Sequence, residues 1–230
     1  MKPFADYVRP VSIDDVVGQQ HIIGEGKPLT NILKSGEIPN MIFFGPSGTG
    51  KTTVANICAA ATSKKLYKLN ATNASLKDIR DVAATIDDFE GRGGILLYLD
   101  EIQNFNKKQQ QSLLEYIENG SITLIASTTE NPYFYIYNAI LSRCTVMEFK
   151  PVLPEDIVSA LKRAQNYFEK IYPSKKITAD DEVLMQIACS AYGDVRKALT
   201  IFDMCVKSKM ALGDTVEIDS DAVTSITQKS

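Results

Sequence analysis

Hydrophobic residues in the first two thirds of the chain follow two alternating patterns. One is a spacing of three and four residues, as in Val54, Ile57, Cys58 and Ala61. The other is a short run that is mostly apolar, at 41–44, 66–69, 95–99, 122–126 and 146–149. Uninterrupted apolar runs are typical of parallel strands buried on both faces, and the wider spacing is typical of amphipathic helices. The pattern predicts an α/β fold in which helices cover both faces of a five-stranded parallel sheet.

Two further helices are predicted between the later runs. Apolar residues recur with helical spacing over 79–86 and over 113–117. Each segment follows a polar residue that has a second polar residue three positions later, which is the spacing of a capping box. These pairs are Ser75 with Asp78 and Asn106 with Gln109.

The pattern changes near residue 150. Pro154 and the two acidic residues after it begin a helical stripe that continues to residue 168. Thr178 is expected to cap a second helix, Gly193 to end it, and Asp194 to cap a third. No strand pattern is evident in this part. The sequence therefore predicts an αβα domain over 1–150 and a small all-helical lid domain over 151–230.

Composition narrows the class of protein. A chain of 230 residues, 44% of them hydrophobic, is long enough for one large core or two modest ones. The formal net charge of −3 argues against a surface that coats nucleic acid indiscriminately, and leaves a local basic groove open. Four dispersed cysteines and one histidine argue against a zinc cluster. With no signal-peptide core and no run near the ~18 apolar residues of a membrane helix, we expect a soluble cytoplasmic protein with no membrane partner.

The segment between the first apolar run and the first helix carries the clearest chemistry. It reads Gly45-Pro46-Ser47-Gly48-Thr49-Gly50-Lys51-Thr52, followed by Thr53, and fits the pattern G-x-x-x-x-G-K-[ST]. In such a loop, backbone N–H groups surround phosphate oxygens at the positive end of the following helix. Lys51 would contact the β- and γ-phosphates, and Thr52 would ligate Mg²⁺. The alternative is a glycine-rich turn that matches by chance, and the flanking strand and helix argue against it.

The third apolar run ends in two acidic residues, Asp100 and Glu101. A carboxylate at the end of that strand can hold Mg²⁺ through its water shell, and the next one can polarise an attacking water. Taken alone, the two residues could equally be surface acids. Together with the phosphate-binding loop that precedes them, they predict a nucleoside triphosphatase that hydrolyses its substrate.

Residues 100–144 resemble the AAA+ clamp-loader clade, and within it most closely the replication-associated recombination protein A family, which is related to the Werner-helicase-interacting proteins. The discriminating motifs are FNKKQQ, TTENP and ILSRC in this order, and VVGQQHIIGEGKPL at 16–29 resembles the N-terminal segment of the same family. The match extends from about Tyr7 to Phe202. It implies a P-loop AAA+ core that binds ATP with Mg²⁺ and hydrolyses ATP to ADP and phosphate.

The resemblance also implies roles near the carboxylate pair. Thr129 occupies the sensor 1 position, where it would contact the attacking water or the γ-phosphate, with Thr128 as the neighbouring alternative. Asn70 occupies a place from which it could hold Glu101 out of position until DNA or a partner binds. The alternative for Asn70 is a simple turn residue.

Further implied roles involve both domains and a neighbouring molecule. Arg143 matches an arginine finger that reaches the nucleotide of an adjacent subunit, and otherwise would form a surface salt bridge. Arg196 matches sensor 2, and otherwise would be an exposed helical arginine. The adenine would lie against Val16, Val17 and Gly18. A finger supplied in trans requires a homo-oligomer.

The sequence departs from the family pattern in three ways. Ser47 stands where the family commonly has proline, and Gln103-Asn104 replaces a His-Arg pair that usually follows the two acids. The family also carries a C-terminal oligomerisation region, before which this sequence stops, so the chain is expected to be a monomer that is catalytically incomplete.

The implied setting is the stalled or damaged replication fork, in recombination and repair. Expected partners are single-stranded DNA, duplex ends and replication proteins such as single-strand-binding protein, with association to the nucleoid if the source is bacterial. Two other functions stay open: a clamp-loader subunit or Holliday-junction branch-migration motor, and a non-hydrolysing scaffold subunit that only binds nucleotide. Aromatic residues at 132–137 could stack on bases or could simply pack a loop.

Overall fold

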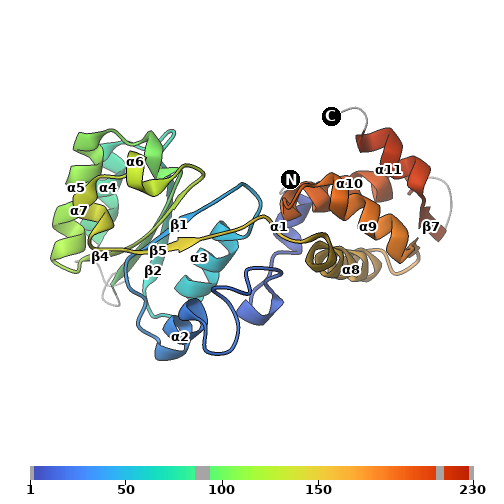
Figure 1. Cartoon of the computed structure of the whole chain (residues 1–230), viewed down its shortest axis with the longest axis horizontal. Helices are drawn as coiled ribbons and strands as arrows, with labels where there is room; N and C mark the ends of the chain where they lie inside the picture. The colour runs from blue at the N-terminus through green and yellow to red at the C-terminus, as the bar shows by residue number, and fades with distance from the viewer. Residues whose placement is uncertain (1–2, 86–93, 211–214, 228–230) are drawn as a thin grey trace.

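The computed structural model describes residues 3–85, 94–210 and 215–227. Its centre is a sheet of five parallel strands in the order β2-β3-β4-β1-β5 (Figure 1). The strands are β1 (Met41–Phe44), β2 (Lys65–Asn70), β3 (Ile95–Asp100), β4 (Ile122–Thr128) and β5 (Thr145–Glu148). Each predicted apolar run coincides with one strand, so the five-stranded parallel sheet is confirmed.

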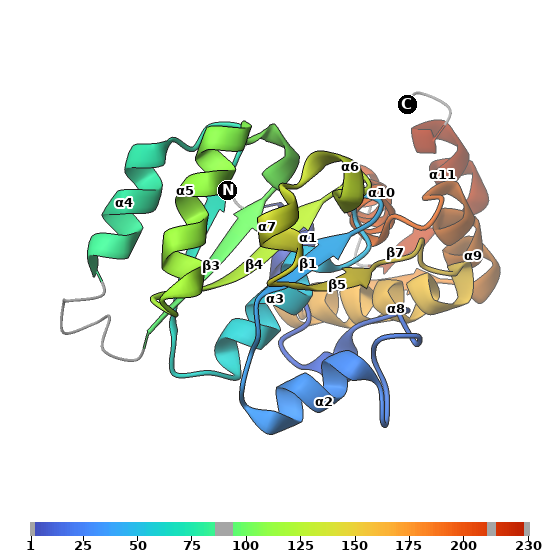
Figure 2. The ribbon, with the colours of Figure 1, turned by 60° about the vertical axis from the view of Figure 1, so that its left-hand side comes forward.

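Helices cover both faces of the sheet (Figure 2). On one face lie α2 (Pro28–Ser35) and α3 (Lys51–Ala60), and on the other lie α4 (Leu76–Ala84), α5 (Lys107–Glu118) and α7 (Asn138–Leu141). Successive strand residues point to opposite faces: Leu96 and Tyr98 of β3 pack on the α3 side, whereas Leu97 and Leu99 pack on the α5 side. Both faces are apolar because both are covered.

The predicted helix starts at Ser75 and Asn106 are confirmed. Each side chain accepts a hydrogen bond from the backbone N–H three residues later, and the side chain of that later residue accepts one in return. These reciprocal bonds satisfy N–H groups that would otherwise lack a partner in the first turn of α4 and of α5. Ile86, the last residue of the predicted α4 stripe, lies outside the described residues.

The second part of the chain contains α8 (Pro154–Ile171), α9 (Asp181–Ser190), α10 (Val195–Lys209) and α11 (Ser220–Thr227). It also contains two strands, β6 (Lys176–Ala179) and β7 (Thr215–Ile218), which pair in parallel. The prediction of an all-helical lid is therefore wrong in this respect. Four-residue strands are too short to show an alternating pattern, and their pairing joins segments almost forty residues apart.

The predicted cap of α9 is also wrong. Thr178 lies inside β6, and the N-cap position of α9 is Asp180. The prediction for α10 is confirmed, because the Asp194 side chain accepts a hydrogen bond from the backbone N–H of Lys197 at 2.8 Å. Gly193, in a left-handed conformation with φ of 84°, lies between the two helices as expected.

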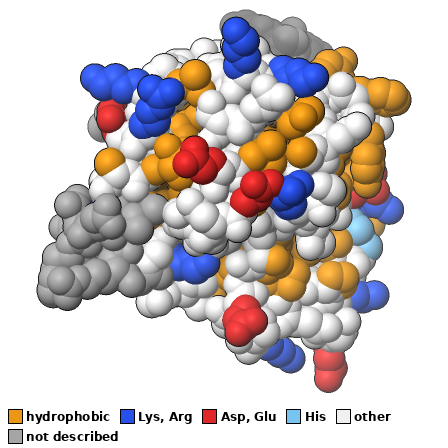
Figure 3. All heavy atoms as spheres, turned by 90° about the vertical axis from the view of Figure 1, so that its left-hand side faces the viewer, with side chains coloured by type: hydrophobic (Ala, Val, Ile, Leu, Met, Phe, Trp, Pro, Cys, Tyr) orange, Lys and Arg blue, Asp and Glu red, His pale blue; other side chains and the backbone are white. Residues whose placement is uncertain are grey.

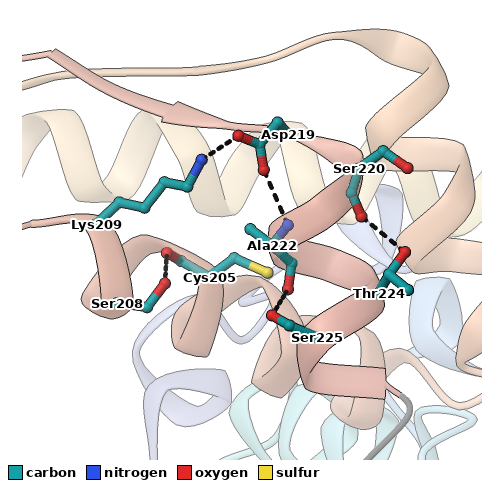
Figure 4. Close-up of polar contacts among 8 residues, drawn as sticks. All are labelled: Cys205, Ser208, Lys209, Asp219, Ser220, Ala222, Thr224 and Ser225. Atoms are coloured by element: carbon teal, nitrogen blue, oxygen red, sulfur yellow. Dashed lines mark hydrogen bonds and ion pairs between the residues drawn. The ribbon is translucent and has the colours of Figure 1, made fainter.

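Polar contacts join α11 to the end of α10 (Figure 4). Asp219 forms an ion pair with Lys209, and its other carboxylate oxygen accepts a hydrogen bond from the backbone N–H of Ala222 at 2.9 Å. These hydrogen bonds, first of all the one from Lys209, lower the pKa of Asp219 below its usual value. The carboxylate thereby links the last turn of α10 to the first turn of α11.

The N-terminal segment packs against the lid, as Figure 1 shows. It comprises α1 (Phe4–Tyr7), which contacts the lid, and the single turn η1 (Ile13–Asp15), whose Ile13 packs on the α3 side of the sheet. The Phe4 ring stacks on that of Phe168 in α8 with 4.4 Å between the ring centroids. Two short segments, η4 (Ile102–Asn104) and α6 (Pro132–Tyr135), follow β3 and β4. Within the described ranges, no helix is both long enough and apolar enough to cross a bilayer.

Candidate nucleotide-binding site

The loop between β1 and α3 has a backbone that requires glycine. Gly48 has φ of 68° and Gly50 has φ of 103°, both left-handed values that disfavour other residues. At Gly45, φ is 142° and an added Cβ would lie 1.9 Å from the Phe149 carbonyl oxygen. The loop is tied to the sheet by a hydrogen bond from the Gly45 N–H to the Thr128 carbonyl, at 3.1 Å. This geometry matches the requirement of a phosphate-binding loop for close backbone approach.

Lys51 is the first residue of α3, and its side chain is buried at 8% exposure. Its Nζ donates hydrogen bonds to the carbonyls of Gly45 at 2.6 Å and Pro46 at 2.8 Å. Burial lowers the pKa of Lys51, and the nearby carboxylates of Glu101 and Asp100 oppose that effect. A buried ammonium beside a glycine loop and a helix N-terminus fits the charge of a polyphosphate.

A pocket opens above this loop, between the sheet and the lid. Most of the predicted site residues line it. These are Val16, Val17, Ser47, Gly48, Thr49, Gly50, Lys51, Thr52, Thr53, Asp100, Glu101, Thr129 and Arg196. The structure therefore brings the loop, the acidic strand end, Thr129 and Arg196 to one cavity.

Other predicted residues lie away from the pocket lining. Gly45 and Pro46 lie in the loop beneath it, and Gly18 faces Val152, with 3.0 Å between an added Cβ and the nearest Val152 carbon. Asn70 and Arg143 are also outside the lining.

One side of the pocket was not predicted from the sequence. It is formed by the N-terminal segment and by the lid helices α8 and α10. The missed lining residues are Ala5, Val8, Arg9, Pro10, Ala160, Arg163, Val195 and Leu199. Most are apolar, as suits a base, and Arg9 also contacts the Thr53 hydroxyl at 3.4 Å. Nothing in the local sequence marks them, because they meet the loop through tertiary packing.

The two acidic residues have distinct surroundings. Asp100 ends β3, and its Oδ1 accepts hydrogen bonds from Ser127 and, at 3.2 Å, from the Tyr98 hydroxyl. Glu101 has a left-handed backbone with φ of 55°, an uncommon conformation for a residue other than glycine. Its Oε2 accepts a hydrogen bond from Gln103 Nε2 at 2.5 Å. The carboxylates therefore diverge, one toward the sheet and one toward η4.

The structure separates the two sensor 1 candidates. Thr129 lines the pocket, and its hydroxyl donates to Glu101 Oε2 at 3.4 Å. Thr128 is buried at 1% exposure and accepts a hydrogen bond from the Glu130 N–H at 3.0 Å. The geometry therefore favours Thr129 over Thr128.

Asn70, the last residue of β2, lies next to Asp100 in the sheet. Its side-chain oxygen accepts a hydrogen bond from the Thr72 N–H at 2.8 Å, as in an ordinary Asx turn. The Glu101 carboxylate is contacted instead by Gln103 and by Thr129. The sequence analysis noted Gln103 as a departure from the family pattern without assigning it a contact.

The lid contacts the loop directly. The N–H of Val195 donates to the Gly48 carbonyl at 3.1 Å, and the Asp194 carboxylate packs against the Gly48 Cα. Arg196 follows, and lines the pocket at the start of α10. The N-terminus of α10 and the loop therefore form a single surface.

Arg143 lies elsewhere, after α7. It forms a salt bridge with Glu118 at 2.6 Å and donates to the Ala139 carbonyl at 2.8 Å. This contact is the surface salt bridge stated as the alternative for Arg143, and the arginine finger stays a prediction.

The chemistry of the site suits magnesium better than zinc. Within the described ranges, no cluster of three or more His, Cys, Asp or Glu residues could hold a metal ion. Mg²⁺ commonly takes one or two protein oxygens and completes its shell with water and phosphate oxygens. Thr52 and Asp100, both in the pocket lining, provide such a pair.

The chain is similar in sequence to known ATPases and recombination proteins. Residues 41–152 match the family described as "ATPase family associated with various cellular activities (AAA)". Over 214 residues the chain is 38% identical to replication-associated recombination protein A of Bacillus subtilis, covering 93% of this chain and 50% of that protein. The same-named protein of Escherichia coli K12 is 35% identical over 219 residues, covering 95% of this chain and 47% of its own length. ATPase WRNIP1 of Dictyostelium discoideum is 33% identical over 207 residues, covering 90% of this chain and 24% of its own. The chain thus spans half or less of these relatives.

Among solved structures, the Thermotoga maritima RuvB Holliday-junction branch-migration motor superposes with a TM-score of 0.75. The alignment covers 97% of this chain and 72% of that one at 22% sequence identity. At this identity the likeness concerns the fold.

Proposed function

We propose that the chain binds ATP with Mg²⁺ and hydrolyses it to ADP and phosphate, because residues 41–152 match the AAA ATPase family. The observation that carries this proposal is the buried Lys51 beside a glycine loop, in one pocket with Asp100 and Glu101. Lys51 binds the β- and γ-phosphates, Thr52 and Asp100 hold the cation, and Glu101 polarises the attacking water.

The remaining site residues complete this assignment. Thr129 contacts the γ-phosphate or the water as sensor 1, and Arg196 contacts the γ-phosphate from the lid as sensor 2. Asn70 holds Glu101 out of position until DNA or a partner binds. The adenine lies near Val16 and Val17, with Gly18 behind them.

Two variants test the proposal. Lys51→Ala is expected to abolish ATP binding in calorimetry, because it removes the cation that neutralises the phosphates. Glu101→Gln is expected to bind ATP as the unaltered chain does and to stop turnover, because an amide is a poor base. Normal turnover by the Glu101→Gln chain would remove that carboxylate from the mechanism.

We further propose that the whole protein acts on DNA at stalled or damaged forks as a homo-oligomer, in the cytoplasm and on the nucleoid of a bacterium. Support comes from the relatives named for replication-associated recombination and from Arg143, which lies outside its own pocket and could serve a neighbour's. Single-strand-binding protein is the proposed replication partner.

The test is ATP hydrolysis with and without DNA ends, measured on this chain and on a longer one that spans the full length of its relatives. Stimulation confined to the longer chain is expected. Nucleotide binding without turnover in both chains would favour a scaffold subunit instead.

The aromatic residues of α6 are the proposed contact with single-stranded DNA. Tyr133, Phe134 and Tyr135 are 65%, 82% and 52% exposed. The buried Gln110 side chain holds this segment by donating to the Tyr135 carbonyl at 3.2 Å and accepting from the Tyr137 N–H at 2.8 Å. Exposed rings on a fixed backbone can stack on bases whatever their sequence.

The charge around these rings is mixed. Figure 3 shows the end of the molecule that carries α4, α5 and α7, where basic and acidic side chains are interspersed with apolar ones. We therefore expect stacking to contribute more than phosphate contacts. Phe134→Ala should weaken binding of a single-stranded oligonucleotide about five- to a hundred-fold, whereas Tyr172→Ala on the lid should not. Equal affinities of the two variants would remove α6 from the DNA contact.

A further inference from the structure

The Tyr98 side chain lies between the two residues assigned to the cation. It projects from β3 toward α3 and is buried at 2% exposure. Its hydroxyl lies 3.0 Å from Thr52 Oγ1 and 3.2 Å from Asp100 Oδ1. A third hydroxyl, that of Ser127 in β4, lies 2.9 Å from the Tyr98 oxygen. One phenol thus touches both proposed ligands and the residue beside them.

The direction of these hydrogen bonds follows from the number of protons. Each hydroxyl has a single proton to donate, and the ionised Asp100 carboxylate can only accept. Ser127 donates to Asp100, and Tyr98 donates to Asp100 or to Ser127. In either case the Tyr98 oxygen is left to accept the proton of Thr52. The chain of hydroxyls therefore starts at Thr52 and ends on the carboxylate.

This direction matters for a cation. A threonine hydroxyl binds a metal through its oxygen lone pairs, so its proton needs an acceptor elsewhere. The oxygen of the buried Tyr98 side chain provides that acceptor. The same phenol helps fix Asp100 Oδ1, which leaves the other carboxylate oxygen for the cation or its water shell.

We propose that Tyr98 is a positioning residue of the divalent-cation site, whose hydroxyl accepts the Thr52 proton and holds Thr52 and Asp100 in the arrangement that binds Mg²⁺ with nucleotide. The proposal rests on the function proposed above. A phenylalanine would serve equally well as an apolar strand residue, and the difference lies entirely in the oxygen.

Tyr98→Phe tests the proposal, because it removes this oxygen and keeps the ring that packs in the core. Binding of a fluorescent, non-hydrolysable ATP analogue is measured in EDTA and over a series of Mg²⁺ concentrations. Binding of Mn²⁺ to the complex with ADP is measured by electron paramagnetic resonance. Tyr116→Phe, on α5 on the opposite side of the sheet, is the matched control. Thermal unfolding confirms that each variant is folded.

Tyr98→Phe is expected to weaken the affinity for the cation about three- to ten-fold, the effect of one hydrogen bond, and to leave affinity for the metal-free analogue unchanged. Tyr116→Phe should change neither. If Tyr98→Phe binds the cation as tightly as the unaltered chain does, the proposed role of Tyr98 is wrong. It is also wrong if Tyr98→Phe loses as much affinity for the analogue in EDTA as with Mg²⁺, because Tyr98 would then support the loop in general and not the cation site. If Mg²⁺ has no effect on binding of the analogue by the unaltered chain, the proposed function itself is wrong, and the failure does not concern Tyr98.

Discussion

The contact between Gly48 and Asp194 offers a sharp test of how the lid is held on the phosphate-binding loop. At Gly48 an added Cβ would lie 1.7 Å from Asp194 Oδ1 and 2.1 Å from its Cγ. Gly48→Ala therefore forces that carboxylate to move. Since Asp194 Oδ1 is the acceptor that caps α10, moving it breaks the bond to the Lys197 N–H.

The magnitude has two parts. Alanine in the left-handed region costs about 1–2 kcal/mol wherever it occurs. The lost cap adds about 1 kcal/mol, and the nearby bond from the Val195 N–H to the Gly48 carbonyl, if it breaks, adds about 1 kcal/mol more. The free energy of unfolding should thus fall by about 2–4 kcal/mol, roughly half of it from the contact with the lid.

Gly120→Ala separates the two parts. Gly120 has nearly the same φ, 73° against 68°, and nothing lies within 4 Å of its added Cβ. Thermal unfolding should show a Tm loss of roughly 2–8 °C for Gly120→Ala, since 1 kcal/mol corresponds to about 2–4 °C at this chain length. The loss for Gly48→Ala should be about twice as large.

Removing Asp194 completes the cycle. In a chain that already carries Asp194→Ala, the cap is gone and the new Cβ meets no carboxylate, so Gly48→Ala should then cost no more than Gly120→Ala. Additive losses in the double variant, or equal losses for the two glycine variants, would refute the idea that this contact carries the strain.

Three other outcomes are expected. Gln103→Leu should raise basal turnover by up to about ten-fold with unchanged ATP affinity, because it frees Glu101 from a strong hydrogen bond, and slower turnover would contradict this. Asp219→Asn should lower Tm at pH 7, because the lowered pKa of Asp219 stabilises the fold above pH ~4. The difference in Tm between the variant and the unaltered chain should narrow below pH ~4, where acid protonates Asp219 in the unaltered chain. A difference that widens in acid would contradict this. In the native chain, iodoacetamide should label the exposed Cys189 well before Cys58, because burial raises the pKa of Cys58 to about 12. Peptide mass spectrometry measures the two labelling rates, and equal rates would contradict this.

Much of the αβα part was predictable because its signals are local. A continuous apolar run, a glycine loop ending in Lys51-Thr52 and a helical spacing all lie within residues 41–61, and each constrains its own stretch of backbone. The acidic end of β3 was predictable for the same reason. The meeting of Asp100 with the loop followed from parallel strands, whose carboxyl ends share one edge of the sheet.

The lid was less predictable. The caps of α4, α5 and α10 were found because a cap lies within three residues of the N–H that it binds. The pairing of β6 with β7 was missed because it joins two short segments with two helices between them. Sequence periodicity cannot report a pairing whose partner lies so far along the chain.

The sequence by itself determined the order of strands and helices in the αβα part, the phosphate-binding loop and the carboxylates that face it, because these depend on neighbours within a few residues. Tertiary structure decided which side chains meet at the site. It placed the N-terminal segment and α8 in the pocket wall and Gln103 against Glu101. It also turned Tyr98 from a strand residue into a bridge between Thr52 and Asp100. Such contacts form between segments far apart in sequence, and a hydroxyl acquires its role from whatever the fold brings within 3 Å of it.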